Sequence, residues 1–286
     1  MIQEIKKIGG GLKPTPKDAR DFKLGQIIKW PKLEELPENF ALEPISVKNQ
    51  GDTDYCTAFA TCGMSELQEG VELSPEWSFA VSKQISGDPE SYGQDIRTAL
   101  KVHTKYGAVE KSEAPYSVEN DEDAKIRYIN NWPQELFEKA GKHQKQSYFK
   151  IEGWPKGWDA FDAIRTAIWL FRDLKRAVAF GVLWSWQLSN VFLEDYSPTG
   201  CGHCVYLRGW NKHIEFDNYY LLLQNSYGKE AGGSGTHLIS RNVVNDMAEK
   251  FGAYMFIDIP PEIAKQKVWS PFRRLLEAIK KFFSEL

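Results

Sequence analysis

The residue best placed to do chemistry is Cys56, which follows the turn-rich stretch 50–54 and opens a run of helix-forming residues. The unpaired N–H groups at the start of a helix lower the pKa of a cysteine thiol from about 8.5 toward 7. Cys56 would then be a thiolate, which is the nucleophilic form of the side chain. Most cysteines are instead small buried apolar residues, and we expect this of Cys62, which lies inside the same helix.

A thiol nucleophile needs a base, and the base needs a group that orients it. Among the five histidines, His203 stands at the start of a run of strand-forming residues, where the backbone would hold its side chain rigidly. Asn225 ends the next such run. If the two strands are neighbours, Asn225 lies near His203. Cysteine, histidine and asparagine in this chain order have the arrangement of a Cys-His-Asn hydrolase.

The elements that must position these residues are helices in the first half of the chain and strands in the second. Ser74-Pro75-Glu76 is typical of a helix start, with Ser as the N-cap and Pro in the first turn. Helices are predicted over 56–68, 75–84 and 94–106, and strands over 177–183, 204–210 and 219–224. This layout predicts an α+β fold with two lobes.

The composition excludes several classes of protein. The chain has 286 residues, of which 42% are apolar and 26% charged, as in an ordinary globular protein. Its net charge of −3 gives no basic surface, so we expect no nucleic-acid partner. No run approaches the ~18 apolar residues of a membrane-spanning helix, and the N-terminus lacks the apolar core of a signal peptide. Four cysteines are too few for a disulfide scaffold. We expect neither a metal nor a cofactor.

Three separated motifs resemble those of papain-like cysteine peptidases. VKNQG at 47–51, followed by CTAFA at 56–60, is similar to their active-site segment. GHCV at 202–205 is similar to their histidine strand, and LQNSYG at 223–228 is similar to their asparagine segment. The resemblance extends from about residue 14 to about residue 259. It implies a papain-like fold, with a helical N-terminal lobe, a β-sheet or barrel C-terminal lobe and an active-site cleft between them.

The resemblance implies a role for each residue of the site. Cys56 is the nucleophile, His203 is its ion-pair partner and general acid, and Asn225 orients the imidazole. Gln50 and the backbone N–H of Cys56 form the oxyanion hole. Tyr227 shields the histidine–asparagine hydrogen bond from water. The implied reaction is the hydrolysis of peptide bonds by a cysteine-type endopeptidase through an acyl-enzyme intermediate.

The substrate implied by the resemblance is an extended polypeptide that lies in the cleft. Gly93 falls where the family has a glycine that lets the substrate backbone approach closely, and Gln94 replaces the second glycine of that pair. Tyr55 stands where a small residue is usual, so we expect it to narrow the cleft. Together with Tyr227, these are the candidate substrate-binding residues.

Two cysteines of the family's extracellular members are missing from this chain. The resemblance places Thr53 and Ser91 where those members have a disulfide between the nucleophile loop and the cleft wall. The joint loss fits a reducing compartment, so we expect a cytoplasmic or virion-associated protein. The segment 13–22 and Thr57 after the nucleophile resemble the short prokaryotic or viral branch of the family. That branch lacks a long pro-domain, and only 35 residues precede Leu36 in this chain.

Motif positions and composition also divide the chain. We expect an extended N-terminal segment over 1–35 and a peptidase domain over 36–260, with its helical lobe at about 40–130 and its β lobe at about 131–260. An amphipathic C-terminal helix is expected over 261–286. That helix either packs on its own domain or contacts a partner or a membrane surface.

The sequence leaves other functions open. A catalytically silent papain-fold protein, such as a binding protein or a structural virion component, would keep the fold without the reaction, and isopeptide cleavage or acyl transfer would use the same residues. The tetrapeptide Cys201-Gly202-His203-Cys204 matches the Cys-x-x-Cys motif of redox enzymes. It begins a strand-rich run, however, and no thioredoxin-like pattern of strands and helices surrounds it. A reversible Cys201–Cys204 disulfide that switches off His203 is a further hypothesis.

Overall fold

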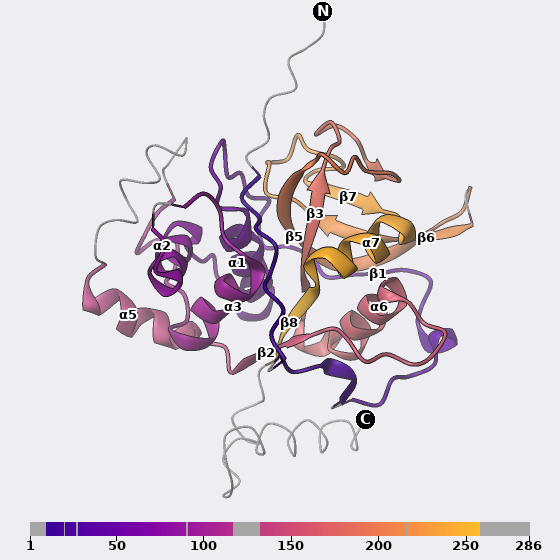
Figure 1. Ribbon diagram of the computed structural model, residues 1–286, viewed down its shortest axis with the longest axis horizontal. Coiled ribbons are helices and arrows are strands. Elements are labelled where there is room, and N and C mark those ends of the chain that lie inside the picture. Colours follow the sequence, from indigo (N-terminus) through magenta and orange to yellow (C-terminus); the bar gives the residue numbers. More distant parts are fainter. Residues whose placement is uncertain are drawn as a thin grey trace, which may run out of the picture.

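Two lobes of different architecture make up the protein in this computed structural model, one of helices and one built on a sheet (Figure 1). The structure describes residues 10–257 apart from 20, 27, 90, 117–131 and 216. The arrangement confirms the predicted α+β, two-lobed fold. The C-terminal helix expected over 261–286 lies outside the described residues. Among those that are described, no helix is both long and apolar enough to cross a membrane.

The helical lobe is formed by α1 (Cys56–Glu69), α2 (Pro75–Ser86), α3 (Ile96–Lys105) and α5 (Gln134–Ala140). The predicted cap of α2 is present, because Ser74 Oγ accepts a hydrogen bond of 3.1 Å from the Trp77 N–H. The third helix starts later than predicted, since Asp95 caps it by accepting from the Thr98 N–H at 3.1 Å. Trp77 and Phe137 pack edge-on with ring centroids 5.6 Å apart, which joins α5 to α2.

The other lobe is an eight-stranded sheet in the order β2-β8-β3-β5-β6-β7-β4, with β1 paired to β5 beside this path. The strands are β1 (Phe40–Ala41), β2 (Ser147–Lys150), β3 (Val178–Trp184), β4 (Phe192–Leu193), β5 (Cys201–His213), β6 (Asn218–Gln224), β7 (Thr236–Ile239) and β8 (Ala253–Ile257). Helices α6 (Ala160–Leu170) and α7 (Arg241–Phe251) belong to the same lobe, and short 3-10 turns occur at Leu24–Gln26, Leu33–Glu35, Gly141–His143 and Arg172–Leu174.

The three predicted strands are confirmed as β3, β5 and β6, of which β5 is longer than predicted at both ends. β5 and β6 are antiparallel neighbours, and Tyr206 pairs with Gln224. Because β6 ends where β5 is still close to its beginning, the residue after β6 lies beside the first residues of β5. This register brings Asn225 to His203.

The central helix α1 joins the two lobes. Most of its 14 residues are buried, and it packs against β5 of the sheet. Gly63 makes the close contact possible, because a Cβ at this position would lie 2.5 Å from the ring of Tyr206 on β5. The side chain of Tyr206 is itself buried, so it has little room to move away. The contact fixes the height of α1, and therefore of Cys56, relative to the sheet.

Replacement of Gly63 by alanine is expected to destabilise the protein, although alanine favours a helix interior over glycine by about 1 kcal/mol. Overpacking against Tyr206 costs about 1–3 kcal/mol, so the free energy of unfolding in urea should fall. Gly141→Ala is the matched control, since a Cβ there meets nothing within 4 Å. A Gly63→Ala protein as stable as this control would contradict the close packing of α1 on β5.

Candidate active site

Cys56 is the first residue of α1, as predicted, and its side chain is completely buried. The environment does not lower the pKa of the thiol as the sequence led us to expect. Burial raises the pKa of the Cys56 thiol to about 12, against backbone hydrogen bonds from Cys204, Gly11 and Thr57 that lower it. We predicted that the helix N-terminus would lower the pKa of Cys56 enough to give a thiolate. This prediction is wrong for the present arrangement, in which the thiol is enclosed. The contact with Cys204 also places the thiol beside the residue that follows His203.

His203 and Asn225 form a direct hydrogen bond, with His203 Nε2 3.0 Å from Asn225 Oδ1. The same amide oxygen accepts a hydrogen bond of 2.7 Å from the Ser226 N–H, which fixes the orientation of the amide. His203 Nε2 must therefore be the protonated nitrogen. Nδ1 is buried and makes no hydrogen bond with the described residues. Burial lowers the pKa of His203 to about 4, against the Asn225 hydrogen bond that raises it.

Sequence reasoning missed His237, which holds Asn225 from the other side. His237 Nε2 lies 3.1 Å from Asn225 Nδ2, and His237 Nδ1 lies 2.6 Å from the carbonyl oxygen of Asn190. A carbonyl only accepts, so Nδ1 carries the proton and Nε2 accepts from the amide. Burial lowers the pKa of His237, which keeps the ring neutral. No motif marked this residue, because only the pairing of β6 with β7 brings it to Asn225.

Aromatic rings enclose this histidine pair. Tyr227 stacks on the His203 ring, with centroids 4.9 Å apart and planes at 26°. Trp184, at the end of β3, packs edge-on against His203 at 5.5 Å and against His237 at 5.1 Å. The predicted position of Tyr227 over the site agrees with this stacking, whereas Trp184 was missed because β3 lies far from the motifs in sequence.

Gln50 lies at the junction of the two lobes. Its Oε1 accepts a hydrogen bond of 2.6 Å from Ser226 Oγ, and its Nε2 donates to the Thr53 carbonyl at 2.7 Å. The Gln50 N–H also donates to the Ser226 carbonyl at 2.8 Å. The amide is therefore held in one orientation between the nucleophile loop and the asparagine segment.

The Tyr55 side chain differs from its predicted position along the cleft. It is fully buried in the helical lobe and stacks on Phe79, with ring centroids 4.1 Å apart. The Gln94 side chain is also directed inward, where its Nε2 donates to the Ser82 carbonyl at 3.2 Å. Because both side chains pack into the lobe, only the backbone of Gln94 faces the opposite lobe.

The N-terminal segment passes between the lobes (Figure 1), and the Gly11 backbone contacts the Cys56 thiol. Leu12 N–H donates to the Gly202 carbonyl at 3.0 Å, on the sheet side. On the helical side, Gln94 N–H donates to the Gly11 carbonyl at 2.7 Å, and Lys13 N–H donates to the Gln94 carbonyl at 3.1 Å. Leu12 and Gln94 form a parallel bridge. The backbone groups of Gln94 and Gly202 that face each other across the cleft are thus occupied by this segment.

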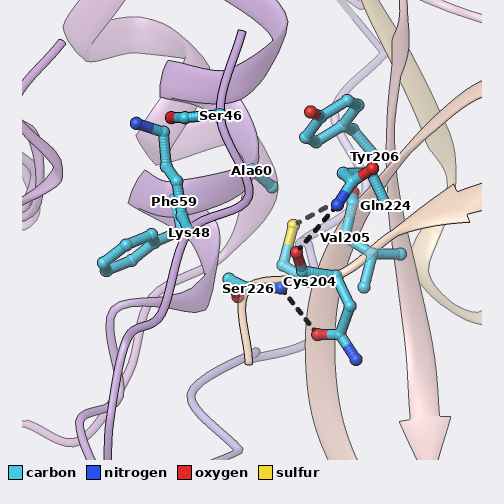
Figure 2. Close-up of a pocket in the computed structure, with 10 residues that line it drawn as sticks. Ser46, Lys48, Phe59, Ala60, Cys204, Val205, Tyr206, Gln224 and Ser226 are labelled. Carbon is cyan, nitrogen blue, oxygen red and sulfur yellow. Dashed lines mark hydrogen bonds between the residues drawn. The ribbon is translucent and has the colours of Figure 1, made fainter. Parts of the chain in front are cut away.

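A cavity of about 10 Å³, which is room for about one water molecule, lies behind the site between α1 and the strands. Figure 2 shows Lys48, Phe59 and Ala60 on the helical side, opposite Cys204, Val205 and Gln224 on the sheet side. It is too small for a ligand. The buried Cys204 side chain lines this space.

The geometry of β5 rules out the Cys201–Cys204 disulfide. Both residues lie in the strand, so their side chains point to opposite faces. At about 3.4 Å per residue their Cα atoms are about 10 Å apart, whereas a disulfide requires less than about 7 Å. Accordingly Cys201 is exposed and Cys204 is buried, and all four cysteines are free. The redox hypotheses for this tetrapeptide are therefore wrong.

A cysteine at the start of a central helix, enclosed against a sheet that carries a histidine–asparagine pair, is the architecture of a two-lobed thiol hydrolase. The family model described as papain family cysteine protease matches residues 39–255. The chain therefore belongs to the papain family and is a cysteine peptidase. No curated protein sequence gives a significant match.

Solved structures share the fold at low sequence identity. Xylellain, a cysteine protease from Xylella fastidiosa, has a TM-score of 0.70 and 20% identity, over 91% of this chain and 100% of its own. The bromelain protease from Ananas comosus, in complex with the E64 inhibitor, has a TM-score of 0.58 and 14% identity, over 78% of this chain and 100% of its own. Digestive procathepsin L 3 of Tenebrio molitor larval midgut has a TM-score of 0.58 and 19% identity, over 83% of this chain and 75% of its own.

Displacement of the N-terminal segment is expected to expose the Cys56 thiol. A Cβ added to Gly11 would lie 2.0 Å from the Asp54 carbonyl oxygen, so Gly11→Ala cannot keep the segment in place. The overpacking costs about 1–3 kcal/mol, so we expect iodoacetamide to alkylate Cys56 about tenfold faster in Gly11→Ala than in the unchanged chain. The rate is measured by mass spectrometry of the peptide that contains Cys56. Gly141→Ala serves again as the control. Equal alkylation rates in both variants would show that the segment does not protect the thiol.

Proposed function

We propose that the protein is an endopeptidase that hydrolyses peptide bonds with Cys56, His203 and Asn225 as its catalytic residues. The observation that carries the proposal is the 3.0 Å hydrogen bond between His203 Nε2 and Asn225 Oδ1. It leaves Nδ1 of the neutral ring as the basic nitrogen. The hydrogen bond from the Cys204 backbone to the Cys56 thiol supports the pairing of that nitrogen with the nucleophile.

In the proposed reaction, the Cys56 sulfur attacks the carbonyl carbon of the scissile peptide bond, and its proton passes to His203 Nδ1. The resulting imidazolium gives this proton to the leaving amine, and an acyl-enzyme thioester remains. Water then attacks the thioester with His203 as the base, which releases the carboxylic acid and restores the thiol. The negative oxygen formed in both steps accepts hydrogen bonds from the Cys56 N–H and Gln50 Nε2, worth about 3 kcal/mol for each donor.

The proposed substrate is a polypeptide in extended conformation. The backbone groups of Gln94 and Gly202 already bind one extended strand, the N-terminal segment, and the same groups suit a substrate backbone. The segment must leave before a substrate binds. Its departure lets water reach the thiol and the imidazole, so the burial that opposes their ionisation is relieved.

The free cysteines support a proposal about the compartment. Thr53 Oγ1 donates to the Gln50 carbonyl at 2.8 Å, and Ser91 Oγ accepts from Lys13 Nζ at 2.6 Å. Hydrogen bonds thus occupy the two positions where the resemblance implied a disulfide in extracellular members. We therefore place the protein in a reducing compartment, such as the cytoplasm or a virion.

The experiment that tests this function is active-site labelling with a peptide epoxide, combined with hydrolysis of a fluorogenic peptide. Cys56→Ala is expected to abolish both. His203→Ala should abolish hydrolysis, and Asn225→Ala should lower kcat by about 10²-fold, as expected when a base loses its orientation. Cys62→Ala is the matched control, because Cys62 lies in the same helix against Ser78. Hydrolysis that survives in Cys56→Ala would exclude the proposed nucleophile.

His237 is expected to act through Asn225 as a positioning residue. His237→Leu leaves the Asn225 amide without its acceptor, and an unsatisfied buried donor costs about 1–3 kcal/mol. We expect kcat to fall about tenfold with KM unchanged, and His237→Gln, whose Oε1 also accepts, to recover most of the loss. His213→Leu, at the far end of β5, should leave kcat as it is. A loss in His237→Leu that Gln does not recover would point to a purely structural role.

A further inference from the structure

The helical wall of the cleft is held from behind by one buried lysine. Lys83 on α2 is fully buried. Its ammonium donates to the carbonyl oxygens of Ser91 and Gly93, the latter at 2.6 Å, and to Ser91 Oγ at 3.3 Å. The Phe79 ring centroid lies 5.2 Å from Nζ. Lys83 therefore binds a short loop, Ser91 to Gly93, that precedes the residue facing the cleft.

Asp54 holds the same loop from the side of the nucleophile. Its Oδ2 accepts a hydrogen bond from the Gly93 N–H, and its side chain is buried two residues before Cys56. Both peptide groups of Gly93 are thus fixed, the N–H by Asp54 and the C=O by Lys83. Gly93 has φ 65°, and a Cβ there would lie 2.0 Å from the Gly11 carbonyl oxygen. Bare backbone is therefore required at this point.

The Gly93 carbonyl and the Gln94 N–H belong to one planar peptide group and point in opposite directions. Lys83 binds the carbonyl on the inner side, and the Gln94 N–H donates outward to the Gly11 carbonyl. Rotation of this plane would break both hydrogen bonds together. The direction of the outward N–H is therefore determined by the ammonium behind it.

We propose that Lys83, together with Asp54, is a positioning residue that aims the Gly93–Gln94 peptide group at the backbone of the polypeptide in the cleft. This inference rests on the proposed function, because it takes that polypeptide to be the substrate. Removal of the lysine also leaves the Ser91 and Gly93 carbonyl oxygens without this donor, which costs stability.

The first test compares substrates of two lengths with Lys83→Met, Lys83→Arg and the exposed control Lys105→Met. For a tripeptide amide that reaches Gln94, we expect Lys83→Met to raise KM about tenfold with kcat little changed, as the loss of one aligned hydrogen bond predicts. A single-residue ester should be hydrolysed equally by all variants. Lys83→Arg, which keeps charged donors, should recover most of the binding. Equal KM values for the tripeptide in Lys83→Met and Lys105→Met would overturn the proposal.

A pH profile separates this role from simple packing. Burial lowers the pKa of Lys83 to about 8, while Asp54 and Asp88 raise it and Lys13 lowers it. Below this pH the ammonium is present, and above it one proton and the attraction to Asp54 are lost. We expect KM for the tripeptide to rise as the pH passes upward through about 8. Lys83→Arg, whose guanidinium stays charged, should show no such rise, and the same rise in this variant would contradict the role.

Amide hydrogen exchange tests the positioning without any activity, in a Cys56→Ala chain. Lys83→Met should exchange its amides at 91–95 and 11–13 about tenfold faster than Lys105→Met does. Asp54→Asn, which keeps the shape of the side chain, provides a second variant with the same expectation. Faster exchange in these variants, together with no peptide hydrolysis by the chain that keeps Cys56, would keep the positioning role and reject the proposed function. Unchanged exchange in both variants would reject the positioning role.

Discussion

One chain of hydrogen bonds determines the chemistry of the site, and it starts at a backbone carbonyl. The Asn190 oxygen can only accept, so it fixes the proton of His237 on Nδ1, and each following group then has one possible direction. Asn225 turns its amide oxygen to His203, which leaves the basic nitrogen of His203 on the other side of its ring. In this buried network, His203 Nδ1 has no hydrogen-bond partner among the described residues. The rings of Trp184 and Tyr227 keep water away from it.

The two lobes meet through contacts that hold Cys56 in place relative to His203. Gln50 binds Ser226 through its side chain and its backbone, and Gly63 lets α1 approach Tyr206 on β5. Lys48 and Glu66 form a buried ion pair of 2.9 Å between the chain that precedes the nucleophile loop and α1. Because these contacts surround the site, enclosure of the thiol and imidazole follows from the packing of the lobes as much as from the segment that covers them.

The sequence predicted those helices and strands whose formation depends on residues close together in the chain. The cap at Ser74, the helix that starts at Cys56 and the strands around His203 and Asn225 each follow from residues close in sequence. His237 and Trp184 could not be found in this way, because strand pairing brings them to the site from β7 and β3. The acidity of Cys56 was misjudged for the same reason. A helix terminus can be recognised in a sequence, whereas the burial that outweighs it depends on residues far from Cys56 in the chain.

The direction of the N-terminal segment in the cleft determines which of its backbone groups contacts the Cys56 sulfur. Gly11 meets the Cys56 sulfur with its backbone N–H, and its carbonyl oxygen turns away to Gln94. The segment thus presents a hydrogen-bond donor to the sulfur, while the Gly11 carbonyl is bound by Gln94. A tethered strand of this kind competes for the cleft at an effective concentration on the order of millimolar. Occupancy of the cleft is then an equilibrium within one molecule, whose position does not depend on the protein concentration.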